Sequence, residues 1–304
     1  MLKQRFHQVA IAALAALTLA GCSGGAPSSA PPAAANAATA ASAVIERQAE
    51  FGELERRFDA RLGVYALDTG TGREVVHRAD ERFAFASTHK ALSSGEVLRR
   101  TSPADLDRRI TYTQADLVEN SPVTEQHVAD GLTLREVIDA AIRYSDNTAA
   151  NLLFRELGGP AELTAALRGL GDTTTRSDRT ETDLNRTSPG DPRDTSTPRA
   201  LAASLRAYTT GDVLAPEQRA LLNGMMGANT LTADLIPAGV PEGWRVGDKS
   251  GAADHGTRND IAVVHPPNRA PIMLSVLSDR AAVDADYDDA LIAEATKIAV
   301  NALG

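Results

Sequence analysis

The chain has 304 residues and a formal net charge of −9 at pH 7. That length is enough for one large domain or two interleaved ones. The excess of acidic residues argues against nucleic-acid binding and against a basic membrane-binding patch. Aromatic residues are few and alanine is abundant, so we expect many helices.

The N-terminus has the pattern of an export signal. A basic start is followed by Val9–Ala20, an apolar run too short to be a comfortable membrane span. The run ends in Leu19-Ala20-Gly21-Cys22, which resembles the lipobox of bacterial lipoproteins and contains the only cysteine of the chain. The resemblance implies that residues 1–21 are removed and that Cys22 is lipidated, which would anchor an exported protein to the outer face of the membrane. An ordinary signal peptide with an incidental cysteine is the alternative.

After this segment, residues 22–43 contain mostly Ala, Pro, Ser and Gly without an apolar period, and we expect a disordered tether. The folded domain is expected to span residues 44–304. Val44–Phe58 is charged and periodic, which predicts an amphipathic helix. Arg61–Asp68 and Glu74–His77 read as two strands joined by a Gly-rich turn, and so as a hairpin.

An extended run then gives way to a helical one at Ser87. If the helix begins there, Ser87 and Lys90 lie three residues apart on one face, at a helix N-terminus that favours developing negative charge. A hydroxyl beside an amine is the arrangement of an acyl-transfer nucleophile with its base. The chain has only four lysines, and a lysine can lose its proton whereas an arginine cannot, so Lys90 and Lys249 call for a role.

The middle of the chain is predicted to be helical. Thr133-Leu-Arg-Glu136 looks like a capping box, and Thr148–Leu157 reads as a helix ended by two glycines. Asp178–Pro198 has no period and is long for a connection, so it is either functional or disordered.

Strand patterns return at Trp244–Lys249, Asp260–His265 and Ile272–Ser278, and a last helix is expected over Asp286–Leu303. Because strands lie at both ends of the domain, we expect them to form one sheet. The predicted fold class is α+β: three layers, α/β/α, with a mainly antiparallel sheet and an inserted all-helical domain at about residues 87–225.

Four short motifs occur in order along the chain. They are Ser87-Thr-His-Lys90, Ser145-Asp146-Asn147, Glu181-Thr-Asp-Leu-Asn185 and Lys249-Ser250-Gly251. Each motif alone is weak, but by order, spacing and flanks the chain after the tether resembles the class A serine β-lactamases. The resemblance implies that it hydrolyses penicillins and cephalosporins, which would confer β-lactam resistance, and that it needs no cofactor.

The resemblance also implies catalytic roles. Ser87 would attack the lactam carbonyl and form an acyl-enzyme, with either Lys90 or Glu181 through a water as the base for that step. Glu181, with Asn185 helping to hold a water, would then remove the acyl group. Ser145 would pass a proton to the departing nitrogen.

The implied binding residues surround these groups. The backbone N–H groups of Ser87 and Ala252 would form the oxyanion hole, and Asn147 would bond the substrate amide and Lys90. A cationic, hydroxyl-lined edge made by Lys249, Ser250 and Arg258, beside Gly251, would take the substrate carboxylate. Arg179 and Asp194 would clasp the loop that carries Glu181.

Some features limit or redirect the resemblance. The third motif has Ser250 where threonine is usual, which keeps the hydroxyl, and Asn120 stands where many members have an aromatic ring. His89 is interpreted as facing away from Ser87. No histidine spacing suits a metal, so we assign none.

We expect a monomer whose partner is a small β-lactam. The alternatives are a D,D-peptidase or esterase of the same fold, and a penicillin-binding sensor lipoprotein that acylates without turnover.

Overall fold

The computed structural model describes residues 43–304, so the predictions for residues 1–42 lie outside the described part. Its centre is a six-stranded sheet with the strand order β1-β3-β2-β10-β9-β8. The strands are β1 Val44–Glu46, β2 Arg61–Asp68, β3 Glu74–His77, β8 Arg245–Ala253, β9 Thr257–His265 and β10 Ile272–Asp279. All neighbours are antiparallel except β1 and β3. Both ends of the domain therefore build one sheet, as the sequence predicts.

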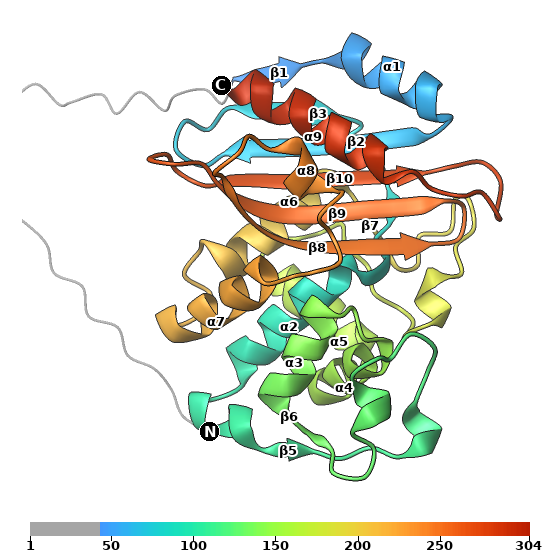
Figure 1. The fold of residues 1–304 in the computed structure, drawn as a ribbon, viewed down its shortest axis with the longest axis vertical. Coiled ribbons are helices and arrows are strands. Elements are labelled where there is room, and N and C mark those ends of the chain that lie inside the picture. The colour runs from blue at the N-terminus through green and yellow to red at the C-terminus, as the bar shows by residue number, and fades with distance from the viewer. Residues whose placement is uncertain (1–42) are drawn as a thin grey trace, which may run out of the picture. The chain divides into compact units, whose positions relative to one another are not determined.

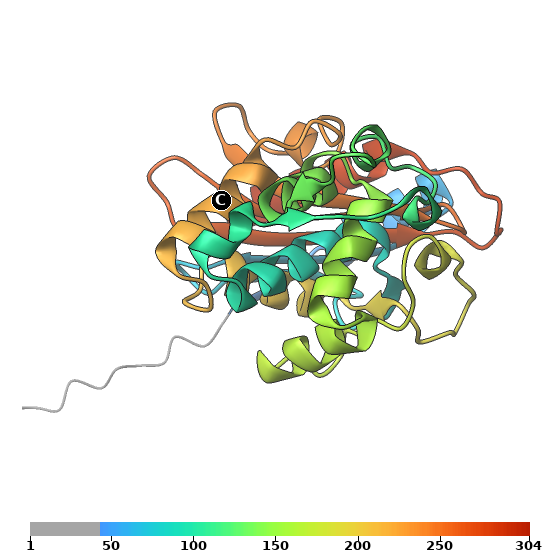
Figure 2. The same cartoon turned by 90° about the horizontal axis from the view of Figure 1, so that it is seen from below.

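Helices cover both faces of the sheet (Figure 1). One group consists of α1 Gln48–Phe58, the short α8 Ile236–Gly239 and α9 Asp289–Leu303. The other consists of α2 His89–Arg100, α3 Leu134–Arg143, α4 Asn147–Leu157, α5 Pro160–Gly169, α6 Pro198–Thr209 and α7 Pro216–Gly227. The view from below in Figure 2 places α2, α4 and α5 in front of the sheet. The α+β class is confirmed by this arrangement.

Two short ribbons complete the second layer. The strands β4 Phe83–Ala84 and β7 Thr195–Ser196 pair next to Ser87, and β5 Arg109–Ile110 pairs with β6 Leu132–Thr133 farther away. The first ribbon matters for the site, because it ties the chain just before Ser87 to the end of the long loop that begins near Asp178.

Alternation along the strands divides the core in two. On β2, Val64 packs in the cluster that includes α1 and α9, whereas Tyr65 faces the cluster that includes α2 to α7. On β10, Leu274 and Met273 divide in the same way. Full burial of an aliphatic side chain contributes about 1.5–3 kcal/mol, so both layers are held strongly against the sheet.

One predicted helix is wrong at its start. Val44–Glu46 forms β1, paired in parallel with β3, and the helix begins only at Gln48. The free edge of β3 offers backbone groups that a β-branched pair such as Val44-Ile45 suits well, and this tertiary pairing overrides the helical period. The last helix likewise begins later than expected, at Asp289, because Asp288 caps it.

Several local predictions are confirmed. Thr133 and Glu136 form a capping box, with Thr133 N 2.7 Å from the Glu136 Oε2 that accepts its hydrogen bond. Gly158 ends α4 with φ +96°, a conformation that favours glycine. Within residues 43–304, no helix combines the length and the apolar character needed to cross a membrane.

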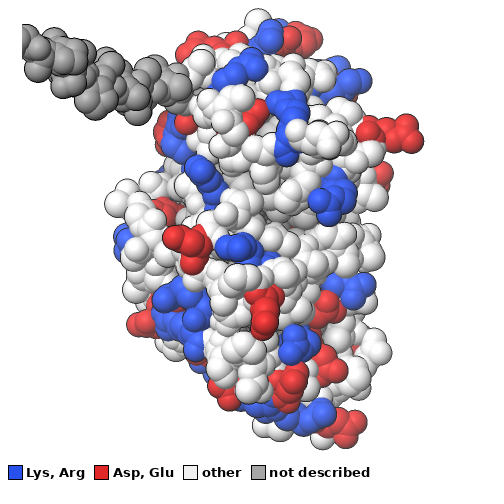
Figure 3. Space-filling model, turned by 90° about the vertical axis from the view of Figure 1, so that its left-hand side faces the viewer, with Lys and Arg blue, Asp and Glu red and all other residues white. Residues whose placement is uncertain are grey.

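Charged side chains of both signs mix on the surface. On the face shown in Figure 3, acidic and basic groups alternate over short distances rather than forming one broad field. Many of them pair, as Arg199 does with Glu74 and Asp80. Exposed pairs of this kind contribute little stability, typically about 0–1 kcal/mol each.

Candidate active site

Ser87 lies where strand gives way to helix, as predicted. It sits in a single 3-10 turn, Ala86–Thr88, directly before α2. Asn259 of β9 donates from Nδ2 to the carbonyl oxygen of Ala84 at 2.7 Å, which fixes the approach to this turn. A Cβ at Gly251 of β8 would lie 2.8 Å from the Ser87 nitrogen, so only glycine lets the strand pass so close.

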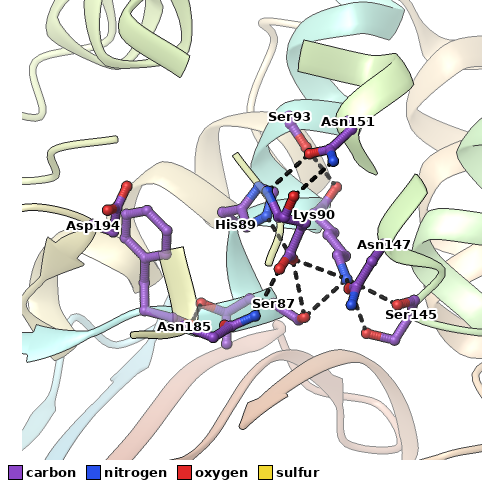
Figure 4. A network of polar contacts seen from close by, with 12 residues as sticks. Ser87, His89, Lys90, Ser93, Ser145, Asn147, Asn151, Asn185 and Asp194 are labelled. Carbon is purple, nitrogen blue, oxygen red and sulfur yellow. Dashed lines mark hydrogen bonds and ion pairs between the residues drawn. The ribbon is translucent and has the colours of Figure 1, made fainter. Parts of the chain in front are cut away.

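Lys90 is fully buried one turn after Ser87, and its ammonium has five acceptors around it (Figure 4). Nζ lies 2.9 Å from Ser87 Oγ and 3.1 Å from Glu181 Oε1. It also lies 2.6 Å from Asn147 Oδ1, 2.8 Å from the Ser145 carbonyl oxygen and 3.4 Å from Ser145 Oγ. An ammonium has three hydrogens, so these contacts compete.

The second motif joins α3 to α4, as predicted. Asp146 is buried and caps α4, accepting from the Ala149 nitrogen at 2.8 Å and from the Thr124 nitrogen and hydroxyl. This capping fixes the turn that brings Ser145 and Asn147 to Lys90. Ser145 has φ +54°, an uncommon conformation for a serine, which the capped turn holds in place.

Glu181 is brought to Ser87 by the long loop, which therefore is ordered and carries part of the site. Arg179 Nε lies 2.6 Å from Asp194 Oδ2, which confirms the predicted clasp. Asp194 Oδ1 also accepts from the Arg179 backbone nitrogen at 3.0 Å. Asn151 of α4 holds the Glu181 backbone at both its nitrogen and its carbonyl oxygen, each at 2.8 Å. The peptide bond after Glu181 is cis.

The Glu181 carboxylate accepts from several donors. Oε1 lies 3.4 Å from Ser87 Oγ and 3.1 Å from Lys90 Nζ, while Oε2 accepts from Asn185 Nδ2 at 2.7 Å. Burial alone would raise the pKa of Glu181, but the Lys90 charge and the His89 hydrogen bond outweigh it and hold that pKa well below its ordinary value. Burial lowers the pKa of Lys90 despite Glu181. A charged base thus faces a lysine that is prone to lose its proton.

His89 makes no side-chain hydrogen bond to Ser87 in residues 43–304, in keeping with the prediction that it faces away from Ser87, but it contacts another residue of the site. Its Nε2 lies 3.3 Å from Glu181 Oε1, and its ring stacks on Phe154 with centroids 4.8 Å apart. The side chain does turn away from Ser87, but α2 is covered on that side by the loop, which brings Glu181 over it. Burial lowers the pKa of His89.

The third motif lies within β8, which continues two residues past Gly251, rather than at a strand end as predicted. Lys249 is fully buried and donates to the Ser250 carbonyl oxygen at 2.8 Å. Burial, with the charge of Lys90, lowers the pKa of Lys249 to about 7. Two buried acids lie nearby: burial raises the pKa of Asp248 to about 6 and, with Asp248 beside it, raises that of Asp260 well above its ordinary value.

A cavity of about 580 Å³ opens onto these residues. Eight of its lining residues belong to the predicted site, namely Ser87, Ser145, Asn147, Asn185, Ser250, Gly251, Ala252 and Arg258. Asn120 also lines it. Lys90, Glu181 and Lys249 lie behind this lining, at its buried base. The volume suits a small organic ligand.

Arg258 reaches this cavity but carries a partner of its own. Its Nε lies 2.6 Å from Asp289 Oδ1, and its guanidinium stacks on Tyr287 at 4.7 Å. The cationic edge expected from Lys249 and Arg258 is thus partly neutralised by Asp289, an acid that no motif indicated.

A larger cavity, of about 1220 Å³, lies on the other side of the loop and contains none of the motif residues. Charged side chains line it, and most are already paired with each other, as Arg61 is with Asp279 and Arg78 with Glu55. Size alone would select this cavity, but the convergent nucleophile, base and acid lie at the smaller one. We therefore place the candidate active site there.

Sequence reasoning missed three kinds of residue here: His89, the backbone anchor Asn151, and the buried acids Asp248 and Asp260. His89 lies inside the first motif, so its position one residue before Lys90 was a signal, but its partner is 92 positions away. Asp248 and Asp260 lie near the third motif on neighbouring strands, and an acid within or at the start of a predicted strand was the available signal.

Comparison with known proteins gives one consistent result. A family model described as the β-lactamase enzyme family matches residues 46–303. "Beta-lactamase 3" of Bacillus cereus is 50% identical over 295 residues, covering 97% of this chain and 93% of that protein. "Beta-lactamase AST-1" of Nocardia asteroides is 50% identical over 304 residues, covering 99% and 96%. The crystal structure of a class A β-lactamase from Clostridium kluyveri superposes with a TM-score of 0.83 at 47% identity, over 84% of this chain and 97% of that one.

Proposed function

The chain belongs to the class A serine β-lactamases and is a β-lactam hydrolase, and from this membership we propose that it opens penicillins and cephalosporins through an acyl-enzyme on Ser87, conferring β-lactam resistance. The observation that carries the proposal is the meeting of three groups in one buried place. Ser87 Oγ lies 2.9 Å from Lys90 Nζ and 3.4 Å from Glu181 Oε1. Nucleophile, proton acceptor and water-activating carboxylate thus contact one another, and Ser87 lines the cavity.

In the acylation step, the Ser87 oxygen bonds to the lactam carbonyl carbon and its proton leaves to a base. Ser87 accepts a hydrogen bond from Lys90 and donates one to Glu181. If Lys90 stays an ammonium, the proton goes toward Glu181. If Lys90 first passes a proton to Glu181, over 3.1 Å, the neutral amine takes the Ser87 proton directly. Both routes fit the geometry.

The C–N bond of the lactam then breaks, and the nitrogen takes a proton. Ser145 is the proposed donor, since its Oγ lies 3.4 Å from Lys90 Nζ and can be reprotonated from it. Backbone N–H groups of Ser87 and Ala252 are proposed to stabilise the oxyanion. The close packing of Gly251 against the Ser87 nitrogen supports this pairing.

In the deacylation step, water adds to the ester carbon and Glu181 takes its proton; the bond from that carbon to Ser87 Oγ then breaks, and the proton passes to Ser87 Oγ. Glu181 Oε1 is occupied by Lys90 and His89, whereas Oε2 accepts only from Asn185 among the hydrogen bonds described for residues 43–304. A water bound at Oε2 and Asn185 would stand beside the ester. The depressed pKa of Glu181 keeps it ionised and so ready to accept.

The test is turnover of a chromogenic cephalosporin by a soluble form that begins at residue 43. We expect many turnovers per enzyme and none from Ser87→Ala. Glu181→Ala should slow deacylation more than acylation, so mass spectrometry should find an acyl adduct that persists on Ser87. A wild type that releases one stoichiometric burst and stops would instead indicate a penicillin-binding sensor. Preferred cleavage of D-alanyl peptides would indicate a D,D-peptidase.

We also propose that the protein acts as a monomer on the outer face of the cell membrane, anchored by Cys22. The support is the sequence pattern that ends in Leu19-Ala20-Gly21-Cys22. Cys22→Ser should move the protein from the membrane to the soluble fraction, and continued membrane association would contradict the lipid anchor. Sedimentation of the form that begins at residue 43 should give the mass of one chain.

A further inference from the structure

Among the described residues, His89 is the one donor to the Glu181 carboxylate to which neither the motifs nor the mechanism above gives a role. Its side chain is 1% exposed and lies between two aromatic rings, stacked on Phe154 with an interplanar angle of 7° and 5.7 Å from Phe85. Nε2 reaches Glu181 Oε1 at 3.3 Å. Lys90, the next residue of α2, reaches the same oxygen with its Nζ at 3.1 Å; both side chains are labelled in Figure 4.

The surroundings of the ring decide which nitrogen carries hydrogen. Ionised Glu181 can only accept, so Nε2 must be the donor. Nδ1 is buried and has no hydrogen-bond partner. A proton on Nδ1 would therefore be buried without an acceptor, which is costly. The geometry alone favours a neutral imidazole with hydrogen on Nε2.

A second observation concerns Lys90. Its ammonium has five acceptors for three hydrogens, so it cannot hold Glu181 fully while it also serves Ser87, Ser145 and Asn147. A neutral Lys90 would have still fewer hydrogens to share. His89 differs, because the only polar partner of its side chain in the described structure is Glu181 and its ring is fixed by stacking.

We propose that His89 is a positioning residue that holds Oε1 of Glu181 through a neutral Nε2–H, whatever the charge state of Lys90, and so keeps Oε2 directed at the deacylating water. The inference deepens the proposed function and rests on Glu181 acting as the deacylating base. A neutral donor suits this task, because it orients the carboxylate without adding a second cation against it and without giving it a proton.

The charged groups that face His89 set the expected pH behaviour. They are Glu181 from the loop, Lys90 from its own helix and Asp194 from the clasp. Burial and Lys90 lower the pKa of His89, so the ring is expected to stay neutral while Glu181 works. Since donors stabilise the ionised carboxylate, loss of the Nε2 donor should raise the pKa of Glu181.

Two matched variants separate the hydrogen bond from the packing. His89→Phe keeps a ring that can stack on Phe154 but removes the donor. His89→Gln restores an N–H near the position of Nε2 without the ring. In the phenylalanine variant we expect the acid limb of the profile of kcat against pH to shift to higher pH by about one unit. This shift is a tenfold change in the proton affinity of Glu181. Near neutral pH its deacylation should fall about three- to tenfold.

The glutamine variant should return the acid limb to within about half a unit of the wild-type position. If both variants shift the limb equally, or neither shifts it, the Nε2 donor does not position Glu181 and the proposal is overturned. A purely structural role would lower stability in both variants without moving the limb.

The imidazole ¹⁵N spectrum gives a readout that does not depend on turnover. The His89 resonances are those missing from the phenylalanine variant. We expect a neutral ring with hydrogen on Nε2 from about pH 5 to pH 8, the range over which ordinary histidines titrate. A ring that carries hydrogen on Nδ1, or that becomes charged in this range, would overturn the proposal. A wild type that acylates once and stops would contradict the proposed function instead, and this spectrum would then decide the state of His89.

Discussion

Two lysines are fully buried in the described part of the chain, and their surroundings differ in one respect. Beside Lys90 stands a single carboxylate, Glu181, which accepts from Lys90, His89 and Asn185. Beside Lys249 stand two, Asp248 and Asp260, which interact with each other and each leave one oxygen buried without a hydrogen-bond partner. Glu181 has a pKa held low, whereas both aspartates have raised ones.

A nearby lysine therefore does not by itself keep a buried carboxylate charged. Burial penalises the charge in both places, and what differs is the number of donors within hydrogen-bond distance. Glu181 has several, including the lysine itself. No salt bridge within 4 Å joins Lys249 to either aspartate in residues 43–304, and its hydrogen bond goes to the Ser250 carbonyl oxygen instead. One lysine therefore faces a carboxylate that is held ionised, and the other lies beside a pair of acids that hold extra protons.

The largest expected effect comes from replacing each lysine by arginine. Lys90→Arg should lower kcat by about 10³-fold, because a guanidinium cannot take part in proton transfer and has no room in a fully buried position. Lys249→Arg keeps a cation at the substrate edge, and we expect mainly a rise in KM, by about tenfold. Stopped-flow and steady-state kinetics on both variants measure the difference. Equal losses of kcat would show that the two lysines do not differ in function, and thermal unfolding controls for folding.

A smaller effect is expected on stability as a function of pH. The raised pKa values of Asp248 and Asp260 mean that the folded state binds more protons than the unfolded state above about pH 4, so stability should fall as pH rises through about 6. Glu181 has a lowered pKa, so its contribution should be lost as pH falls below about 4.5. The contribution of these three carboxyls to stability is therefore greatest at about pH 4 to 4.5, and the lowered pKa of Lys249 adds stability only as pH rises above about 7.

Asp260→Asn should remove most of the loss on the alkaline side. The change is expected to be about 1–2 kcal/mol in the free energy of unfolding between about pH 5 and pH 8, measured by urea titration. Glu181→Gln is the matched control and should alter only the acid side. An unchanged alkaline slope in Asp260→Asn would mean that the two aspartates are ionised in the folded protein and that the contrast between the lysines is wrong.

The smallest effect concerns the more exposed cation at the cavity edge. Arg258 is 12% exposed and its partner Asp289 33% exposed, and such partly solvated pairs contribute about 1 kcal/mol or less. If Arg258 attracts the substrate carboxylate, Asp289→Asn should free its charge and lower KM about two- to threefold with kcat unchanged. A higher KM would show that Asp289 is needed to orient the guanidinium. Arg258→Ala then gives the largest rise in KM that loss of the guanidinium can cause.

Much of the fold was predictable because its signals are local. Strand patterns and turn signals identified the strands, Thr133 and Glu136 identified a helix start, and the four motifs identified the residues that meet at the cavity. What failed depended on tertiary pairing. Val44–Glu46 becomes a strand only because the edge of β3 is free.

The missed site residues have the same explanation. His89 meets Glu181 only once the long loop has folded over α2, and no local pattern shows that. Asp248 and Asp260 become neighbours through the register of β8 and β9, which sets Asp260 opposite Ser250, two residues from Asp248. Register and loop placement follow from the whole core rather than from any short window.

The order of strands in the sheet also constrains how the chain reaches its native state. β2 lies next to β10, and Arg61 pairs with Asp279 across 218 positions. During synthesis the first hairpin must wait for nearly the whole domain before its inner edge is covered, and contacts of such long range make folding slow. Until β10 has been synthesised, the edge of β2 lacks its partner strand, and an unpaired edge is a site where strands of other chains can pair wrongly.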